Sequence, residues 1–258
     1  MKPNFKKTAL DLIEWHNLAI FVITETRFDG PRADNIIKGL PFDEAYSTET
    51  IGFAGGIWLL WRSNLVEMDI LSATEQEIHA IVQVRSLSQT WLFSAIYGSP
   101  RFRERSLLWN NLKTLSIRHD LPWAVMGDFN DVTKAEEKFG GNGINIRRVN
   151  AYNECMDFCN LIDLGFSGLK FTWSNCRDLP NLIQQRLDRV WVNSGWKFLY
   201  PEAIVSHLAR FNSDHCPLLL SLAPNLGQRG HRPFRFQPMW LSHDDFPGIV
   251  REAWEGND

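Results

Sequence analysis

Acidic and amide side chains follow the ends of two apolar stretches of the sequence. Glu25 comes after the apolar run at 18–23, and Asp128 and Asn130 come after the apolar residues at 124–126. The carboxyl ends of strands are where α/β sheets place their ligand sites. A single aspartate after a strand is more often a turn residue, so the pattern gains meaning only if other such groups join it.

Further candidates precede two later apolar stretches. Asp188 stands before 190–192, and Asp214 and His215 stand before 217–220. Taken singly, these residues are more often caps, turn formers or, for His215, a core histidine. Because several such groups recur beside buried strands, we expect the fold to bring their side chains together.

This set of residue types suits the hydrolysis of a phosphate ester. Mg²⁺ prefers one or two carboxylates together with water and substrate oxygens. An attacking water needs a carboxylate such as Asp128 to orient or deprotonate it, and an amide such as Asn130 can fix that carboxylate. A histidine such as His215 can stabilise the charge that develops on the phosphate, and a carboxylate partner would raise its pKa.

Composition limits the protein class. The 258 residues are 44% hydrophobic and 12% aromatic, which is enough for a sizeable core. The net charge of −3 argues against a globally basic nucleic-acid binder, although a nuclease with a local acidic site remains compatible with it. No run approaches the roughly 18 apolar residues of a membrane span, and no apolar signal region opens the chain. A soluble, intracellular protein without membrane partners is expected.

Two other patterns invite a functional interpretation that a structural one outweighs. The glycine-rich segment 139–143 lacks the Lys-Ser/Thr of a P-loop, so we predict a surface loop in preference to a phosphate cradle. Cys155 and Cys159 stand four residues apart in a predicted helix and lack the spacing of a metal knuckle, so core thiols are predicted in preference to half of a metal site or a redox pair. The other two cysteines are Cys176 and Cys216.

Hydrophobic periodicity predicts an α/β chain that ends in a polar linker. Helices are predicted at 5–18, around 107–115 and at 147–160. Strands are predicted at 18–23, 57–61, 66–70, 78–84, 91–97, 122–126, 171–174, 189–192, 203–205 and 217–220. The four strands from 57 to 97 are predicted to form an antiparallel meander. Residues 225–258 show no core of their own.

Five segments together resemble the endonuclease/exonuclease/phosphatase superfamily. In the family's order they are Ile23–Thr26, Tyr97–Pro100, Gly127–Asn130, Arg186–Arg189 and Ser213–Pro217. The tetrapeptide Gly-Asp-Phe-Asn alone is a weak signal, but five segments in order across most of the first 220 residues are specific.

A finer resemblance is to the endonuclease domain of plant non-LTR retrotransposons of the long interspersed type. It rests on Phe171–Asn175 and on residues 232–241, which are similar to the linker that leads to the reverse transcriptase of such elements. The resemblance implies an endonuclease domain at 1–224 and a tail at 225–258 that leads toward a reverse transcriptase absent from this chain.

The resemblance implies a four-layer α/β sandwich of two mostly antiparallel or mixed sheets flanked by helices. Family members normally begin with a strand that ends in an asparagine near the metal. This chain starts after that point, so the resemblance implies that the N-terminal strand is lacking, which puts stability and activity in question.

Family roles carry over to seven positions. Glu25 matches the metal-binding glutamate, and Asp188 and Asp214 match acids near the histidine and the metal, one orienting the ring and the other close to the cation. Asp128 matches the acid that orients or activates water. The remaining matches are Asn130 as its companion amide, and Tyr97 and His215 as groups that contact the phosphate.

The leading hypothesis is a Mg²⁺-dependent endonuclease, with Mn²⁺ as the alternative ion, that nicks DNA as a monomer and acts in the nucleus. One alternative is a phosphatase or phosphodiesterase on small or lipid phosphates, and another is an inactive relic that at most binds nucleic acid. Trp173 could stack on a base or pack in the core. The arginines at 101, 103 and 105 could face phosphates, although a solvated helix start is favoured.

Overall fold

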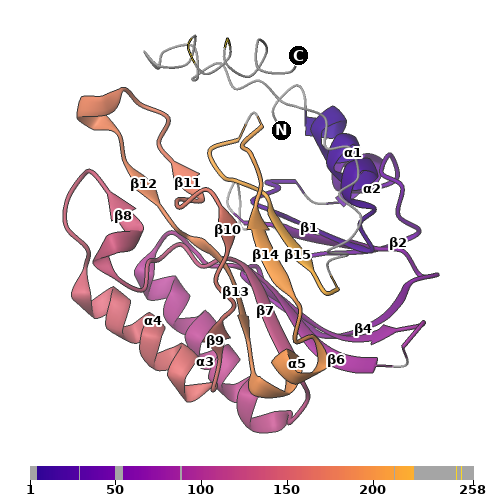
Figure 1. Ribbon diagram of the computed structural model, residues 1–258. Helices are drawn as coiled ribbons and strands as arrows, with labels where there is room; N and C mark the ends of the chain where they lie inside the picture. Colours follow the sequence, from indigo (N-terminus) through magenta and orange to yellow (C-terminus); the bar gives the residue numbers. More distant parts are fainter. Residues whose placement is uncertain are drawn as a thin grey trace. The chain divides into compact units, whose positions relative to one another are not determined.

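A computed structural model describes residues 5–28, 30–49, 55–87, 89–211 and 213–223, together with Gly248 and Arg251 (Figure 1). The chain divides into two compact units, Met1–Pro224 and Asn225–Asp258. The segment 232–241, on which part of the finer resemblance rests, lies outside the described residues. Among the described helices, none is both long and apolar enough to cross a membrane.

Helices and strands alternate along the first unit. The helices are α1 (Phe5–His16), α2 (Gly30–Ile37), α3 (Phe102–Arg118), α4 (Ile146–Phe158), α5 (Ser194–Leu199) and the 3₁₀ turns η1 (Ala135–Glu137) and η2 (Leu179–Asn181). The strands of the first half are β1 (Ile20–Thr24), β2 (Glu44–Ser47), β3 (Ile57–Trp61), β4 (Val66–Ala73), β5 (Glu77–Val84), β6 (Gln89–Tyr97) and β7 (Trp123–Asp128). Those of the second half are β8 (Lys138–Phe139), β9 (Ile162–Asp163), β10 (Ser167–Gly168), β11 (Trp173–Ser174), β12 (Gln184–Gln185), β13 (Asp188–Val192), β14 (Ile204–His207) and β15 (Leu218–Ser221).

A mixed six-stranded sheet with the order β4-β5-β6-β7-β13-β9 forms the centre of this unit. Strands β4, β5 and β6 form the predicted antiparallel meander, whereas β6 and β7 run parallel. The prediction that 57–61 joins this meander is wrong, because β3 pairs with β1 and β2 instead. All five residues of β3 are buried, which suits an inner strand covered on both faces.

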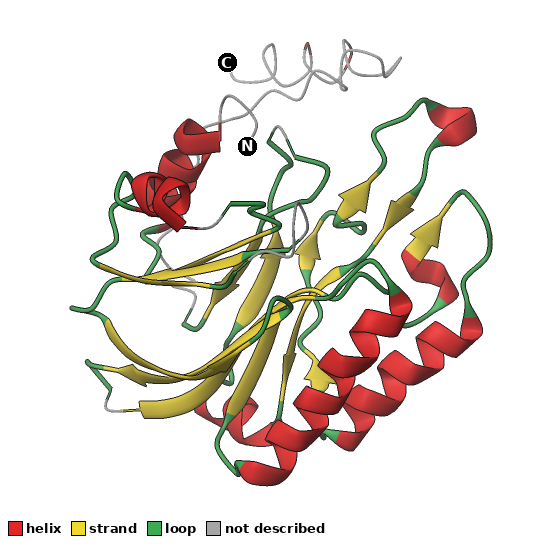
Figure 2. Cartoon of the chain, turned by 180° about the vertical axis from the view of Figure 1, so that it is seen from behind, coloured by secondary structure: helices red, strands yellow, loops and turns green. Residues whose placement is uncertain are grey.

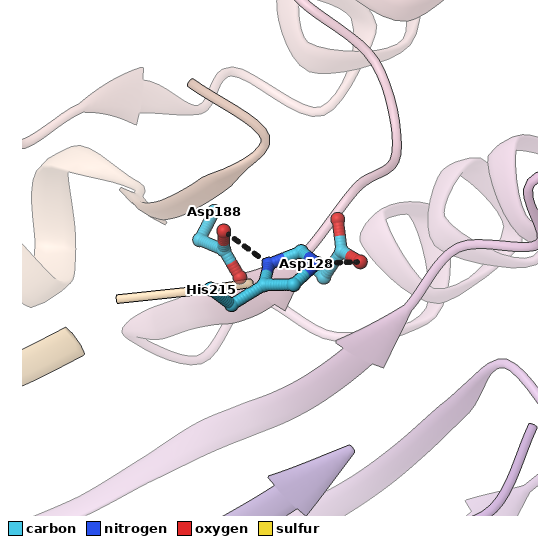
Figure 3. Close-up of side chains that lie close together, drawn as sticks. All are labelled: Asp128, Asp188 and His215. Carbon is cyan, nitrogen blue, oxygen red and sulfur yellow. Dashed lines mark hydrogen bonds and ion pairs between the residues drawn. The ribbon is translucent and has the colours of Figure 1, made fainter. Parts of the chain in front are cut away.

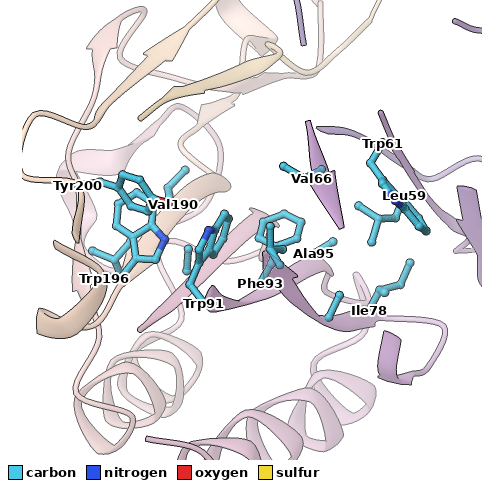
Figure 4. Packing of buried hydrophobic residues seen from close by; sticks show 14 of the residues in the cluster. Leu59, Trp61, Val66, Ile78, Trp91, Phe93, Ala95, Val190, Trp196 and Tyr200 are labelled. Carbon is cyan, nitrogen blue, oxygen red and sulfur yellow. The ribbon is translucent and has the colours of Figure 1, made fainter. Parts of the chain in front are cut away.

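Two three-stranded sheets, β1-β3-β2 and β10-β14-β15, pack against one hydrophobic cluster on the central sheet. Figure 4 shows this cluster, in which Trp91 and Phe93 of β6 lie near Val190 of β13 and Trp196 of α5. The rings of Trp91 and Trp196 meet edge to face with centroids 5.9 Å apart. Such aromatic pairs add about 0.5–1.5 kcal/mol beyond the burial of their area.

Helices cover the outer faces of both sheet layers (Figures 1 and 2). Leu108 and Leu112 of α3 and Tyr152 of α4 belong to a second cluster on the central sheet. Ala9 and Ile13 of α1 pack with Ala33 of α2 against β3. The predicted four-layer α/β sandwich is confirmed, with one sheet layer divided into two three-stranded sheets.

Strands β1 and β15 lie at sheet edges. Among the described strands, β1 pairs only with β3, and β15 pairs only with β14. In an antiparallel ladder every second residue points its backbone N–H and C=O away from the partner strand. Ile20 and Val22 pack on the same cluster as Leu218 and Leu220, so both edges are apolar and border one core. The first element of the described residues is α1.

Several short elements carry too little pattern to be predicted. Helix α2 contains a glycine and a proline and buries only Ala33, while β2 is almost fully exposed. Helix α5 is six residues long and is capped by the preceding Asn193, whose side chain accepts a hydrogen bond from the Trp196 backbone N–H. The glycine-rich segment 139–143 is exposed, as predicted, although its first residue, Phe139, belongs to β8. Cys155 and Cys159 are buried, as predicted for core thiols; Cys216 is buried as well, whereas Cys176 is exposed.

Three buried charges and the half-buried Asp163 connect β13 and the residues before it with η1 and β9. Arg186 and Arg189 donate hydrogen bonds to Asp163 at 2.8 and 2.6 Å, and Arg189 also donates to Glu137. Burial raises the pKa of Asp163, but the hydrogen bond and charge of Arg186 and the charge of Arg189 offset it and leave this pKa below its usual value. A carboxylate with a depressed folded-state pKa stabilises the fold above its unfolded pKa, and this stabilisation is lost as pH falls through the folded value.

Replacement of Asp163 by asparagine should therefore weaken the fold most at neutral pH. Removing one partner of a buried ion pair costs about 3–5 kcal/mol. Urea unfolding followed by circular dichroism should show this loss at neutral pH and a shallower decline of stability below about pH 4 than in the wild type. The exposed residue Asp69 supplies the control, Asp69→Asn. An equal acid slope in wild type and Asp163→Asn would contradict the assignment.

Candidate active site

The register of three central strands places three of the predicted site residues in one row. Asp128, the last residue of β7, lies opposite Asp188, the first residue of β13. On its other side β7 runs parallel to β6, where Asp128 is in register with Tyr97. Residues in register on adjacent strands are about 5 Å apart, so the backbone ladder by itself gathers these side chains.

A threonine ties the segment that carries His215 to the start of β13. The hydroxyl of Thr172 accepts hydrogen bonds from the backbone N–H groups of Leu187 and Asp188 at 2.9 and 3.0 Å. Its carbonyl accepts from the N–H of Cys216 at 2.7 Å. Thr172 therefore helps to hold His215 beside Asp188, although the two lie 27 positions apart in the sequence.

The imidazole of His215 lies between two carboxylates (Figure 3). Its Nδ1 is 2.9 Å from Oδ2 of Asp188, and its Nε2 is 3.9 Å from Oδ2 of Asp128. The His215 side chain is 24% exposed, compared with 4% for Asp128 and 12% for Asp188. The histidine is therefore the accessible member of this group, while both aspartates are largely shielded from water.

Proximity shifts the proton affinities of this group. Burial lowers the pKa of His215, but the charge and hydrogen bond of Asp188 offset this and raise it to about 9. Burial and then the charge of Asp188 raise the pKa of Asp128 to about 7, against the opposing effect of His215. The imidazole is thus cationic at neutral pH, and Asp128 is poised near the pH at which a general base is most effective.

The side chain of Asp128 is held by Asn130. Its Oδ1 accepts from the Asn130 backbone N–H at 2.8 Å and its Oδ2 from Nδ2 at 3.0 Å. The same amide donates to the Gly98 carbonyl at 2.8 Å. The preceding Gly127 has φ +147°, and a Cβ there would lie 2.0 Å from the Ile96 carbonyl oxygen, so only glycine fits. Geometry thus requires the glycine at 127, and the hydrogen bonds of Asn130 fix Asp128 and connect it with Gly98.

Glu25 stands apart from the Asp128–Asp188–His215 group. It accepts a hydrogen bond from Arg27 at 2.5 Å, and its side chain is 37% exposed. Its charge nevertheless helps to raise the pKa of Asp128. Burial, followed by the charges of Glu25 and Asp128, raises the pKa of Tyr97 above its usual value, so the phenol keeps its proton.

Asp214 is oriented by an aromatic side chain. Trp173 Nε1 donates to its Oδ2 at 3.2 Å, and a β-bridge connects Trp173 with His215. The Trp173 ring packs against a small cluster that includes Val132 and Leu187. Of the two predicted roles, the packing favours the core over base stacking, and the hydrogen bond to Asp214 is a role that the sequence did not indicate.

A second buried network joins the two loops of the site. Arg105 is fully buried and donates to Asp131 Oδ2 at 2.7 Å and to the Ser99 carbonyl. Arg148 donates to Asp131 at 3.1 Å and to the Asn130 carbonyl at 3.1 Å. Both predicted roles for Arg105, a phosphate patch and a solvated helix start, are wrong. The partner of Arg105, Asp131, directly follows the Asp-Phe-Asn segment. This position is the one signal in the sequence that could have indicated a buried charge network beside the site.

Comparison with known proteins establishes the family. A sequence profile described as the Endonuclease/Exonuclease/phosphatase family matches residues 4–215. The chain belongs to this family. None of the curated proteins compared with it matches.

Solved structures share the family fold at low sequence identity. The chain is similar to an AP endonuclease from Leishmania major, with a TM-score of 0.66, 14% identity, and 82% of this chain and 80% of that chain covered. For the endonuclease domain of TRAS1, a telomere-specific non-LTR retrotransposon, the TM-score is 0.62 and the identity 14%, with 85% of this chain and 92% of that chain covered. For a mannosyl-6-phosphatase from Bacteroides thetaiotaomicron, the TM-score is 0.52 and the identity 16%, with 84% of this chain and 90% of that chain covered. At these identities the likeness concerns the fold, which hosts both nucleases and phosphatases.

The donor set of the site fits a hard divalent cation. The family is generally metal-dependent. Asp128, Asp188 and His215 have potential ligand atoms within 4.8 Å of one another, although the imidazole of His215 could ligate a metal only in its neutral form. Glu25 and Asp214 add further carboxylate oxygens, and their charges raise the pKa of Asp128 and of His215, respectively. Oxygen donors of this kind suit Mg²⁺ or Mn²⁺ better than soft metals.

Substitution of Asp188 by asparagine should lower the pKa of His215. Without the charge and charged hydrogen bond of Asp188, only the charges of Asp128 and Asp214 oppose the effect of burial, so the pKa of His215 should fall from about 9. Titration of the histidine ring protons by NMR, in metal-free buffer, measures this directly. His119→Gln would identify the His119 resonance, and a His215 pKa that stays high in Asp188→Asn would contradict the pairing.

Proposed function

We propose that this protein is a metal-dependent phosphodiesterase that nicks DNA. The observation that carries the proposal is the row of Tyr97, Asp128 and Asp188 with His215 placed between the two aspartates. The arrangement offers a general base, a cationic donor and a neutral donor within one site, as phosphate-ester hydrolysis requires.

Asp128 is the proposed base toward the attacking water. Its pKa of about 7 allows it to accept a proton near neutral pH, and both of its oxygens are fixed by Asn130. A fixed carboxylate loses little entropy when the water must be aligned with the phosphorus. Asn130 therefore acts on the reaction through Asp128.

His215 is the proposed donor toward the phosphate. The imidazolium is held by Asp188, and its Nε2 side faces Asp128. Positive charge placed where the phosphate gains negative charge stabilises the transition state more than the ground state. Tyr97 keeps its proton and would donate a hydrogen bond to a phosphate oxygen.

Glu25 and Asp214 are the residues that we propose to hold Mg²⁺, or Mn²⁺ in its place. When bound, the cation neutralises charge on the phosphate and on the leaving oxygen. The hydrogen bond from Trp173 orients Asp214 for this role. Partners outside the first ligand shell commonly tune metal affinity in this way.

DNA is proposed as the substrate because the structural relatives include DNA-processing enzymes. They are an AP endonuclease, the TRAS1 endonuclease domain and a zebrafish TDP2 bound to a single-stranded DNA product. We propose that the chain is the endonuclease domain of a plant non-LTR retrotransposon and that it acts in the nucleus. In the full element, a reverse transcriptase domain would follow it in the sequence. We propose that this chain acts as a monomer.

Supercoiled-plasmid nicking tests this function. With Mg²⁺ present the wild type should convert supercoiled to open-circular DNA, and EDTA should abolish the conversion. Asp128→Ala and His215→Ala should each slow nicking by about 10²–10⁴-fold, the usual contribution of general acid–base groups. Asp69→Ala and His119→Ala are controls away from the site. Nicking at the wild-type rate by both site variants would remove the assigned chemistry.

A phosphatase or phosphodiesterase acting on small or lipid phosphates is the second candidate, and the similarity to a mannosyl-6-phosphatase favours it. Turnover of a sugar phosphate or a phosphoinositide by wild type, without plasmid nicking, would support that candidate. A third possibility is an inactive relic that at most binds nucleic acid. A cooperative thermal melt that Mg²⁺ shifts upward would count against it, because a ligand that binds the folded state stabilises that state.

A further inference from the structure

Two residues after β1 adopt a backbone conformation that non-glycine residues rarely adopt. Glu25 has φ +54° and Arg27 has φ +58°. The turn is held from β3's side, because the backbone N–H groups of Thr26 and Arg27 donate to the carbonyls of Gly56 and Gly55 at 3.2 Å each. Strain of this kind persists where the surrounding structure imposes it, and it concentrates at functional sites.

The strained turn brings a guanidinium onto the proposed metal carboxylate. Arg27 donates to Glu25 Oε1 at 2.5 Å. The hydrogen bond and charge of Glu25 raise the pKa of Arg27, and the neighbouring Tyr97 and Asp214 add to the rise. Arg27 is therefore a cation in the electrostatic field of the groups that we assign to metal and phosphate binding, and the sequence pattern did not single it out.

A role in stability does not account for this pair. The side chains of Arg27 and Glu25 are 58% and 37% exposed. Exposed ion pairs contribute little to the free energy of unfolding. The pair joins positions two residues apart in the sequence, so it ties no distant elements together. Its exposure instead leaves the guanidinium free to exchange one oxyanion for another at small cost.

We propose that Arg27 is an exchangeable phosphate-binding residue, which holds Glu25 in the cation-free protein and binds a substrate phosphate oxygen once Glu25 ligates a divalent cation. The proposal rests on the proposed function. A guanidinium matches the two-oxygen geometry of carboxylate and phosphate alike, which is why one side chain can serve both partners. In the first state it balances the charge of Glu25, and in the second it balances the charge of the substrate.

The exchange predicts opposite effects of one substitution on two ligands. Arg27→Gln removes the competitor for Glu25, so the DNA-free protein should bind Mn²⁺ about 3- to 10-fold more tightly by isothermal titration calorimetry. The same variant should bind inorganic phosphate, in the presence of Mn²⁺, about tenfold more weakly, and its KM for duplex DNA should rise accordingly. Arg27→Lys keeps the charge but not the planar geometry, so it should lie between wild type and Arg27→Gln in both affinities.

Arg85→Gln is a matched control, because Arg85 is 50% exposed and pairs with Glu67 at 3.4 Å on β4. It should leave both affinities unchanged. An unchanged or weaker Mn²⁺ affinity in Arg27→Gln, or an unchanged phosphate affinity, would overturn the proposal. The binding measurements need no turnover. A wild type that binds Mn²⁺ and phosphate without nicking DNA would therefore remove the nuclease assignment, while the variant still decides the role of Arg27.

Discussion

The hydrogen-bonded register of β6, β7 and β13 is the constraint on which the site depends. It sets Tyr97, Asp128 and Asp188 side by side through backbone bonds alone. A shift of one residue in either ladder would turn one aspartate to the opposite face of the sheet. Both faces of β13 are buried, with Val190 and Val192 in one hydrophobic cluster and Trp191 in the other, so a shifted register would exchange side chains of very different size between the two clusters.

Buried ion pairs hold the loops that leave this sheet. Asp131 connects Arg105 of α3 with Arg148 of α4 directly behind the loop of Asn130. Glu137 of η1 similarly pairs with Arg186, which precedes β13, and with Arg189 within β13. Buried ion pairs contribute little net stability, because desolvation offsets most of the attraction, but they penalise any other arrangement of the loops. Their contribution here is to hold loop geometry around the reacting groups.

Charge balance explains why four acidic residues can share the neighbourhood. Asp128 and Asp188 lie on adjacent strands, so each opposes the ionisation of the other. The raised pKa of Asp128 reflects its burial together with this repulsion from Asp188. The positive charge of His215 offsets the negative charges of Asp128 and Asp188, and that of Arg27 offsets the charge of the partly exposed Glu25. The cation-free protein therefore carries its own counterions. A divalent ion and a phosphate would replace part of that internal pairing with their own.

The sequence by itself determined the fold class and the types of the site residues. Buried strands and strictly local geometry leave readable patterns, as the glycine required at 127 shows. Partners distant in sequence left no such pattern. The sheet that β3 joins, the burial of Arg105 and the hydrogen bond from Trp173 to Asp214 were decided by tertiary contacts, because each depends on which elements meet in space. Residue type indicates which chemistry is available, whereas distance and burial decide which groups share a proton or a charge.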